Sequence, residues 1–246
     1  MIAGSNLLVR KRGIIIAADV SSLEALGDLV EISIQVPEVA AIKVGFTLAL
    51  RFGLPRVTAT IKSLSSLPII YDHQKAGTDI PQMGKPFAQC CRDSGIAGVI
   101  IFPLSGPRTL ESFVSASLAA ELTPIVGLVM THEAYLRSEG GFIADESPDA
   151  ICRIAKETGV RHFVLPGTKT SVVTRFAEGP LSDIRPTNIL MPGIGAQGGS
   201  ISDAFASAGG HNPYAIIGSA IYKAAHPLET LKGFAAEVRE PSNESE

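Results

Sequence analysis

Eight short apolar runs, each followed by a longer segment of helical period, constrain the fold of this chain more than any other feature. The runs are rich in isoleucine, valine and alanine, and they are apolar throughout rather than alternating. Such runs are typical of strands covered on both faces, and strict alternation of strand and helix predicts right-handed βαβ units in a parallel sheet. The predicted strands span residues 13–20, 41–46, 68–73, 99–104, 124–130, 162–165, 189–191 and 214–218. The predicted helices span residues 23–35, 48–64, 85–93, 109–122, 148–158, 171–177, 201–207 and 227–238, and the second is expected to break near Pro55.

Eight such units in 246 residues predict closure into a (β/α)8 barrel, the TIM barrel, because that fold needs about 250 residues. The alternative is an open doubly wound sheet, in which a GxGxxG turn is expected after the first strand. Ala18-Asp19-Val20-Ser21-Ser22 is not such a turn. With no linker or low-complexity segment, residues 1–246 are expected to form a single α/β barrel domain, and residues 240–246 a frayed tail.

Composition excludes several classes of partner. A net charge of −3 argues against a broad nucleic-acid surface, and no apolar run approaches the ~18–20 residues that span a membrane. The first twelve residues carry no signal-peptide pattern. Cys90, Cys91 and Cys152 are an odd number without a CxxC pair, so we expect reduced thiols in a cytoplasmic protein.

Charged residues gather at the predicted carboxyl ends of the strands, where barrels of this class form their sites. Asp19 ends the first strand, Lys43 lies in the second, and Asp72 and Lys75 follow the third. A lone aspartate there is often only a cap or turn residue. A lysine among apolar neighbours is costly unless paired, and Asp19 and Asp72 are on the strands that flank Lys43. The set of four therefore indicates function more strongly than any member.

The glycine-rich segment Pro192–Gly199 follows the seventh strand. Glycines let backbone N–H groups approach an anion closely, and barrels often bind phosphate in the loops after strands seven and eight. A plain turn is the alternative, although Gln197 adds an amide donor. A second loop, residues 131–145, is long for a compact domain, and such loops are more often functional than idle.

Histidines do not point to a metal site in this sequence. His73 and His132 lie at strand ends, but Lys43 and Lys75 would place positive charge beside any ion, so no metal is expected. The other three histidines, at positions 162, 211 and 226, are expected at the surface or in turns.

Together these motifs resemble those of orotidine 5′-monophosphate decarboxylases. The segment Asp72–Pro81, DHQKAGTDIP, is similar to the family's Asp-Lys-Asp-Ile-Pro signature. Asp19 and Lys43 fall where the family has its strand-one aspartate and strand-two lysine. Pro192–Gly199 resembles its phosphate-gripping loop, and Met130-Thr131 matches a position where the family places a hydroxyl near the pyrimidine.

The resemblance implies a carboxy-lyase that converts orotidine 5′-monophosphate (OMP) to UMP and CO₂ in pyrimidine biosynthesis, with no cofactor. Lys75 would protonate C6 of the pyrimidine, Asp72 would lie near the substrate carboxylate, and Lys43 would bridge Asp72 and the ribose. Asp79 would be contributed by the other subunit of a homodimer. The implied substrate-binding residues are Asp19, Lys43, Ile80, Thr131, Pro192, Gly195, Gln197, Gly198, Gly218 and Ser219.

Three departures from the family pattern stand out. Two residues, His73 and Gln74, separate Asp72 from Lys75 where one is usual, and three separate Lys75 from Asp79 where two are usual, so the loop must bulge. Ser219 replaces a common phosphate-binding arginine and lacks its charge and bidentate fork. Met83 stands where a threonine is common.

Two other functions stay open at this point. The first is a Mg²⁺-dependent sugar-phosphate lyase of the same barrel superfamily, similar to hexulose-phosphate synthase, which holds its ion partly through an acidic residue on strand two. Lys43 occupies that position here. The second is a barrel that binds a nucleotide monophosphate without turning it over.

Overall fold

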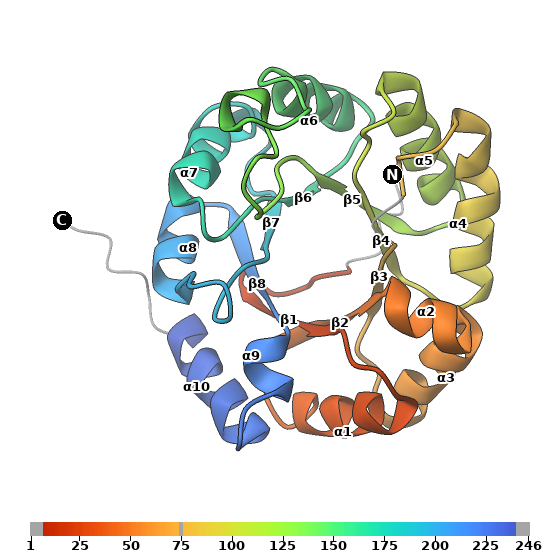
Figure 1. Ribbon diagram of the computed structural model, residues 1–246, viewed down its shortest axis with the longest axis vertical. Helices are drawn as coiled ribbons and strands as arrows, with labels where there is room; N and C mark the ends of the chain where they lie inside the picture. The colour runs from red at the N-terminus through yellow and green to blue at the C-terminus, as the bar shows by residue number, and fades with distance from the viewer. Residues whose placement is uncertain (1–6, 74–75, 240–246) are drawn as a thin grey trace.

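The structure, a computed structural model, describes residues 7–73 and 76–239, and it closes eight parallel strands into a barrel in chain order. A ring of helices surrounds the strands (Figure 1). The strands are β1 Gly13–Ala18, β2 Val39–Gly45, β3 Ile69–Asp72, β4 Gly98–Ile101, β5 Thr123–Gly127, β6 His162–Val164, β7 Asn188–Met191 and β8 Asn212–Ile217. The (β/α)8 fold class predicted from the sequence is confirmed.

The helices follow the predicted alternation, with short additions. The main helices are α1 Leu23–Ser33, α2 Phe46–Phe52, α3 Leu54–Leu64, α4 Gly84–Asp93, α5 Pro107–Ala119, α6 Ser147–Glu157, α7 Thr170–Glu178, α8 Ile201–Ser207, α9 Ser219–Tyr222 and α10 Pro227–Arg239. Short 3-10 turns are η1 Pro81–Met83, η2 Arg137–Glu139 and η3 Ser182–Ile184. The break predicted near Pro55 in the helix over 48–64 falls at Gly53. The helix α9 was not predicted, because four residues are too few to show a helical period.

Two strands end three residues earlier than predicted, which is the largest difference at any strand end. The run in β4 continues to Leu104 and the run in β5 to Met130, but pairing stops at Ile101 and Gly127. Residues 128 and 129 remain buried although they have left the sheet. Apolar composition there reflects burial beneath the loops at the barrel mouth, and burial does not require strand pairing.

Side chains of each strand alternate between two apolar layers. Ile14 and Ile16 of β1 face the helices, whereas Ile15 and Ala17 join the cluster inside the barrel. The next inward position after Ala17 is Asp19. Because the period of a strand is two residues, the charged residues at the strand ends continue the inward rows and so face the mouth of the barrel.

The amino-terminal end of the barrel is closed by the chain itself. Leu7 and Leu8 are buried in the same cluster as the inward side chains of the strands. The Tyr214 hydroxyl donates a hydrogen bond to the carbonyl of Arg10, which ties this segment to β8. Among the described residues, inward-facing side chains therefore fill the amino end of the barrel and leave a cavity at its carboxyl end.

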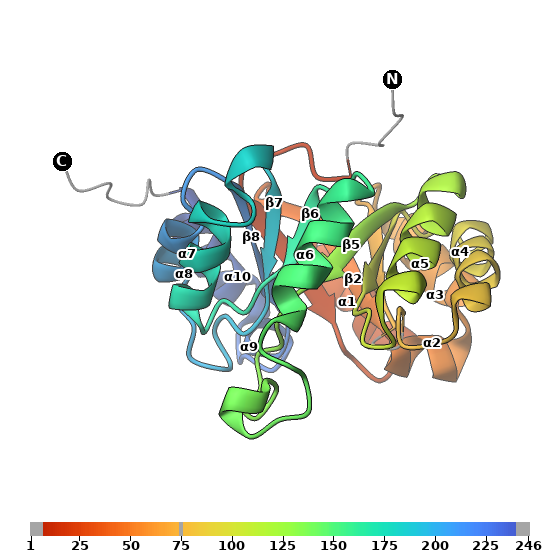
Figure 2. The same cartoon turned by 90° about the horizontal axis from the view of Figure 1, so that it is seen from above.

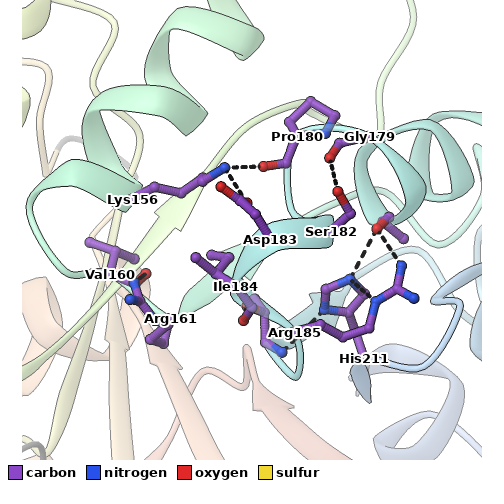
Figure 3. Close-up of polar contacts among 12 residues, drawn as sticks. Lys156, Val160, Arg161, Gly179, Pro180, Ser182, Asp183, Ile184, Arg185 and His211 are labelled. Carbon is purple, nitrogen blue, oxygen red and sulfur yellow. Dashed lines mark hydrogen bonds and ion pairs between the residues drawn. The ribbon is translucent and has the colours of Figure 1, made fainter.

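Polar contacts join α6, α7 and the η3 turn near the starts of β6, β7 and β8 (Figure 3). Lys156 Nζ lies 2.5 Å from Asp183 Oδ1. The His211 ring accepts a hydrogen bond from the Thr187 N–H at Nδ1 (3.1 Å), so the neutral ring carries its proton on Nε2, which lies 3.1 Å from the carbonyl of Ala177. Burial lowers the pKa of His211.

The prediction that His162 lies at the surface or in a turn was wrong, because this residue begins β6. His211 lies in a turn before β8, as predicted, but it is buried. His211 is 6% exposed, and His162 Nε2 lies 2.8 Å from the Asn188 amide inside the barrel. Burial lowers the pKa of His162 to about 4. Polar residues at the start of a strand look like turn residues in a sequence, but here they form a hydrogen-bonded layer across β6, β7 and β8.

The three cysteines, Cys90, Cys91 and Cys152, are unpaired, and the last two are buried. Within residues 7–73 and 76–239, no helix combines the length and apolar character required to cross a bilayer.

Candidate functional site

A cavity of about 360 Å³ opens at the carboxyl end of the barrel. Eight residues predicted for the site line it: Asp19, Lys43, Asp72, Thr131, Pro192, Gln197, Gly218 and Ser219. The remaining lining residues are Ala17, Ile100, Phe102, Val129, Met130, His132, Val164, Gly193, Ile194, Ala196, Ile216 and Tyr222. The cavity therefore has an apolar floor from the inward rows of the strands, and a polar rim from the loops.

An ammonium held between two carboxylates forms one wall of this cavity. Lys43 Nζ lies 3.3 Å from Asp19 Oδ1 and 3.4 Å from Asp72 Oδ2. Strand register explains the arrangement, because Lys43 pairs with Ala17 on β1 and Ile70 on β3, and each aspartate is two residues further along its chain. Lys43 is 7% exposed and Asp72 is 8% exposed. Removing one partner of such a pair would leave buried charge uncompensated, which costs about 3–5 kcal/mol in comparable cases.

Gly45 allows the Asp19 carboxylate to lie against the end of β2. A Cβ atom at position 45 would stand 2.7 Å from Asp19 Oδ1. The side chain of Asp19 keeps 49% of its surface exposed, in contrast to its two partners. Asp19 is thus the member of the array that faces solvent and an entering ligand.

Tyr222 belongs to the cavity and was not predicted from the sequence. It follows β8 on α9 and lines the cavity with Asp19 and Lys43. Burial raises the pKa of Tyr222, the charge of Asp19 raises it further, and Lys43 opposes the shift. The phenol is therefore a hydrogen-bond donor at neutral pH. No motif or periodicity in the sequence indicated this tyrosine as a site residue, because its four-residue helix was not predicted.

Lys75, predicted as the proton donor, lies outside the described residues, as does Gln74. The segment that follows docks on the neighbouring strand: Phe102 N–H donates to the carbonyl of Ala76 at 2.8 Å. Gly77 has a φ of +84°, and a Cβ there would stand 2.7 Å from Ile101 Cγ2 and 2.9 Å from Pro103 Cα. Ala76 and Gly77 are thus packed closely against the end of β4.

Four predicted residues do not line the cavity. Asp79 is exposed, and its Oδ1 accepts a hydrogen bond from the N–H of Ile80 at 2.7 Å. Ile80 is 59% exposed. Gly195 and Gly198 belong to the glycine-rich loop, whose cavity-lining residues are instead Pro192, Gly193, Ile194, Ala196 and Gln197.

The segment between β5 and α6 projects beyond the carboxyl end of the barrel (Figure 2). Glu139 organises it: its Oε2 accepts hydrogen bonds from the N–H groups of Tyr135 (3.2 Å) and Leu136 (3.4 Å). Glu139 Oε1 also lies 2.7 Å from Lys169 Nζ, on the loop after β6, and that contact lowers the pKa of Glu139. Thr131 and His132, at the start of the segment, line the cavity.

In the described part of the chain, no group of three or more His, Cys, Asp and Glu residues is arranged to hold a metal ion.

Comparison with known proteins identifies the family. Residues 12–234, which include all eight strands, match the model of the orotidine 5′-phosphate decarboxylase / HUMPS family. The chain belongs to this family. The resemblance read from the sequence motifs is thereby confirmed.

Relatives in this decarboxylase family match over most of their length. The chain is 33% identical to the orotidine 5′-phosphate decarboxylase of Methanosarcina barkeri over 233 residues, which cover 93% of this chain and 96% of the relative. It is 32% identical to the Pyrococcus furiosus enzyme over 206 residues, which cover 83% and 88%. The crystal structure of the Methanocaldococcus jannaschii enzyme complexed with inhibitor BMP matches with a TM-score of 0.78 at 26% identity, covering 93% of this chain and 99% of that one.

Replacing Gly77 with alanine tests the docking of the loop after β3. The left-handed φ and the contacts with Ile101 and Pro103 together predict a loss of about 2–4 kcal/mol in the free energy of unfolding. Gly159→Ala is the matched control, because its φ of +89° is similar and nothing lies within 4 Å of a Cβ there. Denaturant unfolding of both variants measures the difference. Equal losses would show that Gly77 is not closely packed.

Proposed function

We propose that this protein is an orotidine 5′-monophosphate decarboxylase, which converts OMP to UMP and CO₂ in pyrimidine biosynthesis. The observation that carries the proposal is the buried Lys43 between Asp19 and Asp72 at the mouth of a barrel of this family. The names of the Methanosarcina barkeri and Pyrococcus furiosus relatives support the same reaction.

In the proposed mechanism, the bond between C6 and the carboxylate breaks, and its electron pair stays on C6. The Lys75 ammonium then gives its proton to C6, and the lysine regains a proton from solvent. Its positive charge stabilises the developing negative charge at C6, and a preorganised cation in a cavity closed to water does this more effectively than solvent. Asp72 lies near the departing carboxylate, and Lys43 holds Asp72 and a ribose hydroxyl. Asp19, the exposed member of the array, binds a ribose hydroxyl.

The phosphate of OMP occupies the opposite rim of the cavity. Gln197, the loop from Pro192 and the backbone at Gly218 and Ser219 supply hydrogen-bond donors there, and Thr131 contacts the base. Ser219 gives a hydroxyl where an arginine would give charge, so the protein relies on neutral donors at this position. Binding energy gained at this remote end lowers the barrier at C6 only if it is realised together with the positioning of the pyrimidine.

Lys43 disfavours the Mg²⁺-dependent alternative. A sugar-phosphate lyase of this superfamily would hold its ion with an acidic residue on β2, and the ammonium of Lys43 occupies that place between the two carboxylates. A cation there competes with a divalent ion for the same oxygens. The second alternative is a barrel that binds a nucleotide without converting it. Binding alone would not require the charged array of Asp19, Lys43 and Asp72.

A homodimer that shares Asp79 is part of the proposal. The segments after β2, β3 and β4, which are neighbouring strands, expose the large apolar side chains of Phe46, Leu50, Ile80, Met83 and Leu104. Exposed apolar side chains in adjacent segments are typical of protein interfaces. Asp79 lies among these segments and outside the cavity of its own subunit. A cytoplasmic location, expected from the unpaired cysteines, completes the proposal.

Incubation with OMP, followed by the loss of pyrimidine absorbance, tests the reaction directly. Turnover is expected, and it is expected to persist in EDTA because no step uses a metal. Lys75→Ala should abolish turnover and retain UMP binding. A strict Mg²⁺ requirement would favour the sugar-phosphate lyase, and UMP binding without turnover of OMP by the unsubstituted protein would favour the non-catalytic barrel.

Mixing two inactive variants tests the sharing of Asp79. Lys75→Ala and Asp79→Ala should each abolish most turnover alone. An equimolar mixture that has exchanged subunits should regain about a quarter of normal activity, because half the dimers are mixed and each mixed dimer holds one intact site. A mixture as inactive as its two inactive components would place Asp79 in its own subunit's site, and an active Asp79→Ala variant would place Asp79 outside the reaction.

A further inference from the structure

We propose that Phe102, whose ring fills the space left by Gly127, is a specificity-determining residue that restricts C5 of the bound pyrimidine to hydrogen or a similarly small group. The inference rests on the proposed function and deepens it, because it states which pyrimidine nucleotides the cavity accepts. It follows from the way in which the ends of β4 and β5 fit together.

The ring of Phe102 occupies the place of a missing side chain on the neighbouring strand. Gly127 ends β5, and a Cβ atom there would stand 2.5 Å from Phe102 Cδ1 and closer still to Cε1 and Cζ. Carbon atoms in contact are normally about 3.5–4.0 Å apart, so the ring and any side chain at position 127 exclude each other. The glycine therefore makes room for an aromatic ring at the mouth of the barrel.

Backbone and side-chain contacts together fix the position of this ring. Phe102 is 5% exposed and belongs to the inner apolar cluster, which includes Ile100 of β4 and Ile125 of β5. Its N–H donates to the carbonyl of Ala76 at 2.8 Å, and its carbonyl accepts from the N–H of Leu104 at 2.9 Å. Because close-packed side chains move little, Phe102 presents a firm apolar surface to the cavity that it lines.

The order of the strands places this surface next to C5 of the substrate. In the proposed function, Asp19 after β1 binds the ribose on N1, and Asp72 on β3 lies near the carboxylate on C6. Thr131, after β5, contacts the base, and the first polar group beyond C5 is the oxygen on C4. The atoms N1, C6, C5 and C4 thus follow the order of β1, β3, β4 and β5 around the barrel. Phe102, which follows β4, therefore faces C5.

A firm wall at this place predicts discrimination by size. A hydrogen atom at C5 lets the pyrimidine lie against the Phe102 ring, whereas a methyl group at C5 needs space that the ring already fills. One methylene group in a close-fitting apolar pocket typically changes affinity by about tenfold to 200-fold. The unsubstituted protein should therefore bind UMP at least about tenfold more tightly than 5-methyl-UMP.

Calorimetric Kd values for UMP and 5-methyl-UMP test this role in variants of Phe102. Phe102→Leu and Phe102→Ala open the wall by increasing amounts, so the ratio of the two Kd values should fall stepwise, to within about threefold in Phe102→Ala. Phe113→Leu is the matched control, because Phe113 is also buried but lies on α5 and does not line the cavity. Both ligands share the ribose and phosphate, so a general loss of affinity or stability leaves the ratio unchanged.

Substitution of Gly127 tests whether the glycine makes room for the ring. Gly127→Ala should displace the Phe102 ring toward the cavity and weaken UMP binding by about tenfold or more, because the added Cβ overlaps the ring. In the Phe102→Ala background the same substitution should change the Kd for UMP by no more than about threefold, because the overlapping ring is gone.

Four results would overturn the inference. These are equal affinities of the unsubstituted protein for UMP and 5-methyl-UMP, an unchanged Kd ratio in Phe102→Ala, a ratio that falls as far in Phe113→Leu as in Phe102→Leu, or equal effects of Gly127→Ala with and without the Phe102 ring. Turnover of OMP by the unsubstituted protein is measured separately. Absence of both turnover and UMP binding would refute the proposed function, whereas turnover together with any of the four results would refute only the role of Phe102.

Discussion

A buried ammonium between two carboxylates is the interaction on which the organisation of this site depends. Lys43 can be buried in the barrel only because Asp19 and Asp72 compensate its charge from the neighbouring strands. Parallel pairing with the observed register brings the three groups together. The array fixes the orientation of Asp72, and Lys75 follows Asp72 by three positions in the sequence. The charges that prepare the cavity for a reacting anion are therefore set by the most rigid part of the fold.

The loops at the carboxyl end of the barrel position further residues around this rigid array. Beyond β3, the chain is held by the aromatic contacts of His73 on one side and by the docking of Gly77 against Ile101 on the other. Beyond β5, Glu139 ties its own segment together and joins it to Lys169. In the proposed function, the phosphate of OMP is bound by amide and hydroxyl donors, and Ser219 replaces the usual arginine there. The proposal thus assigns the chemistry and the anchoring of the substrate to different loops on the same barrel end.

Much of this architecture could be predicted from the sequence, and the failures have a common cause. Apolar runs of strand length alternating with helical segments predict the barrel, and the cost of burying Lys43 predicts its pairing with Asp19 and Asp72. Contacts between residues far apart in the sequence were not predicted, because no local sequence pattern indicates them. In the sequence, Gly77 resembles an ordinary loop glycine, and only the structure shows its close contact with Ile101. His211 likewise resembles a turn residue, and its hydrogen bonds to Thr187 and Ala177 are seen only in the structure. Tyr222 lies on a helix too short to show a helical period.

The value of kcat/KM for OMP in Lys43→Met tests the central claim most directly. Methionine keeps much of the volume of lysine and removes the charge, which leaves Asp19 and Asp72 close together without their cation. Removal of one preorganised electrostatic group from an active site typically lowers the rate by about 100- to 1,000-fold, so a fall of at least about 100-fold in kcat/KM is predicted in a protein that stays folded. A folded Lys43→Met variant with kcat/KM within about tenfold of the unsubstituted protein would contradict the account.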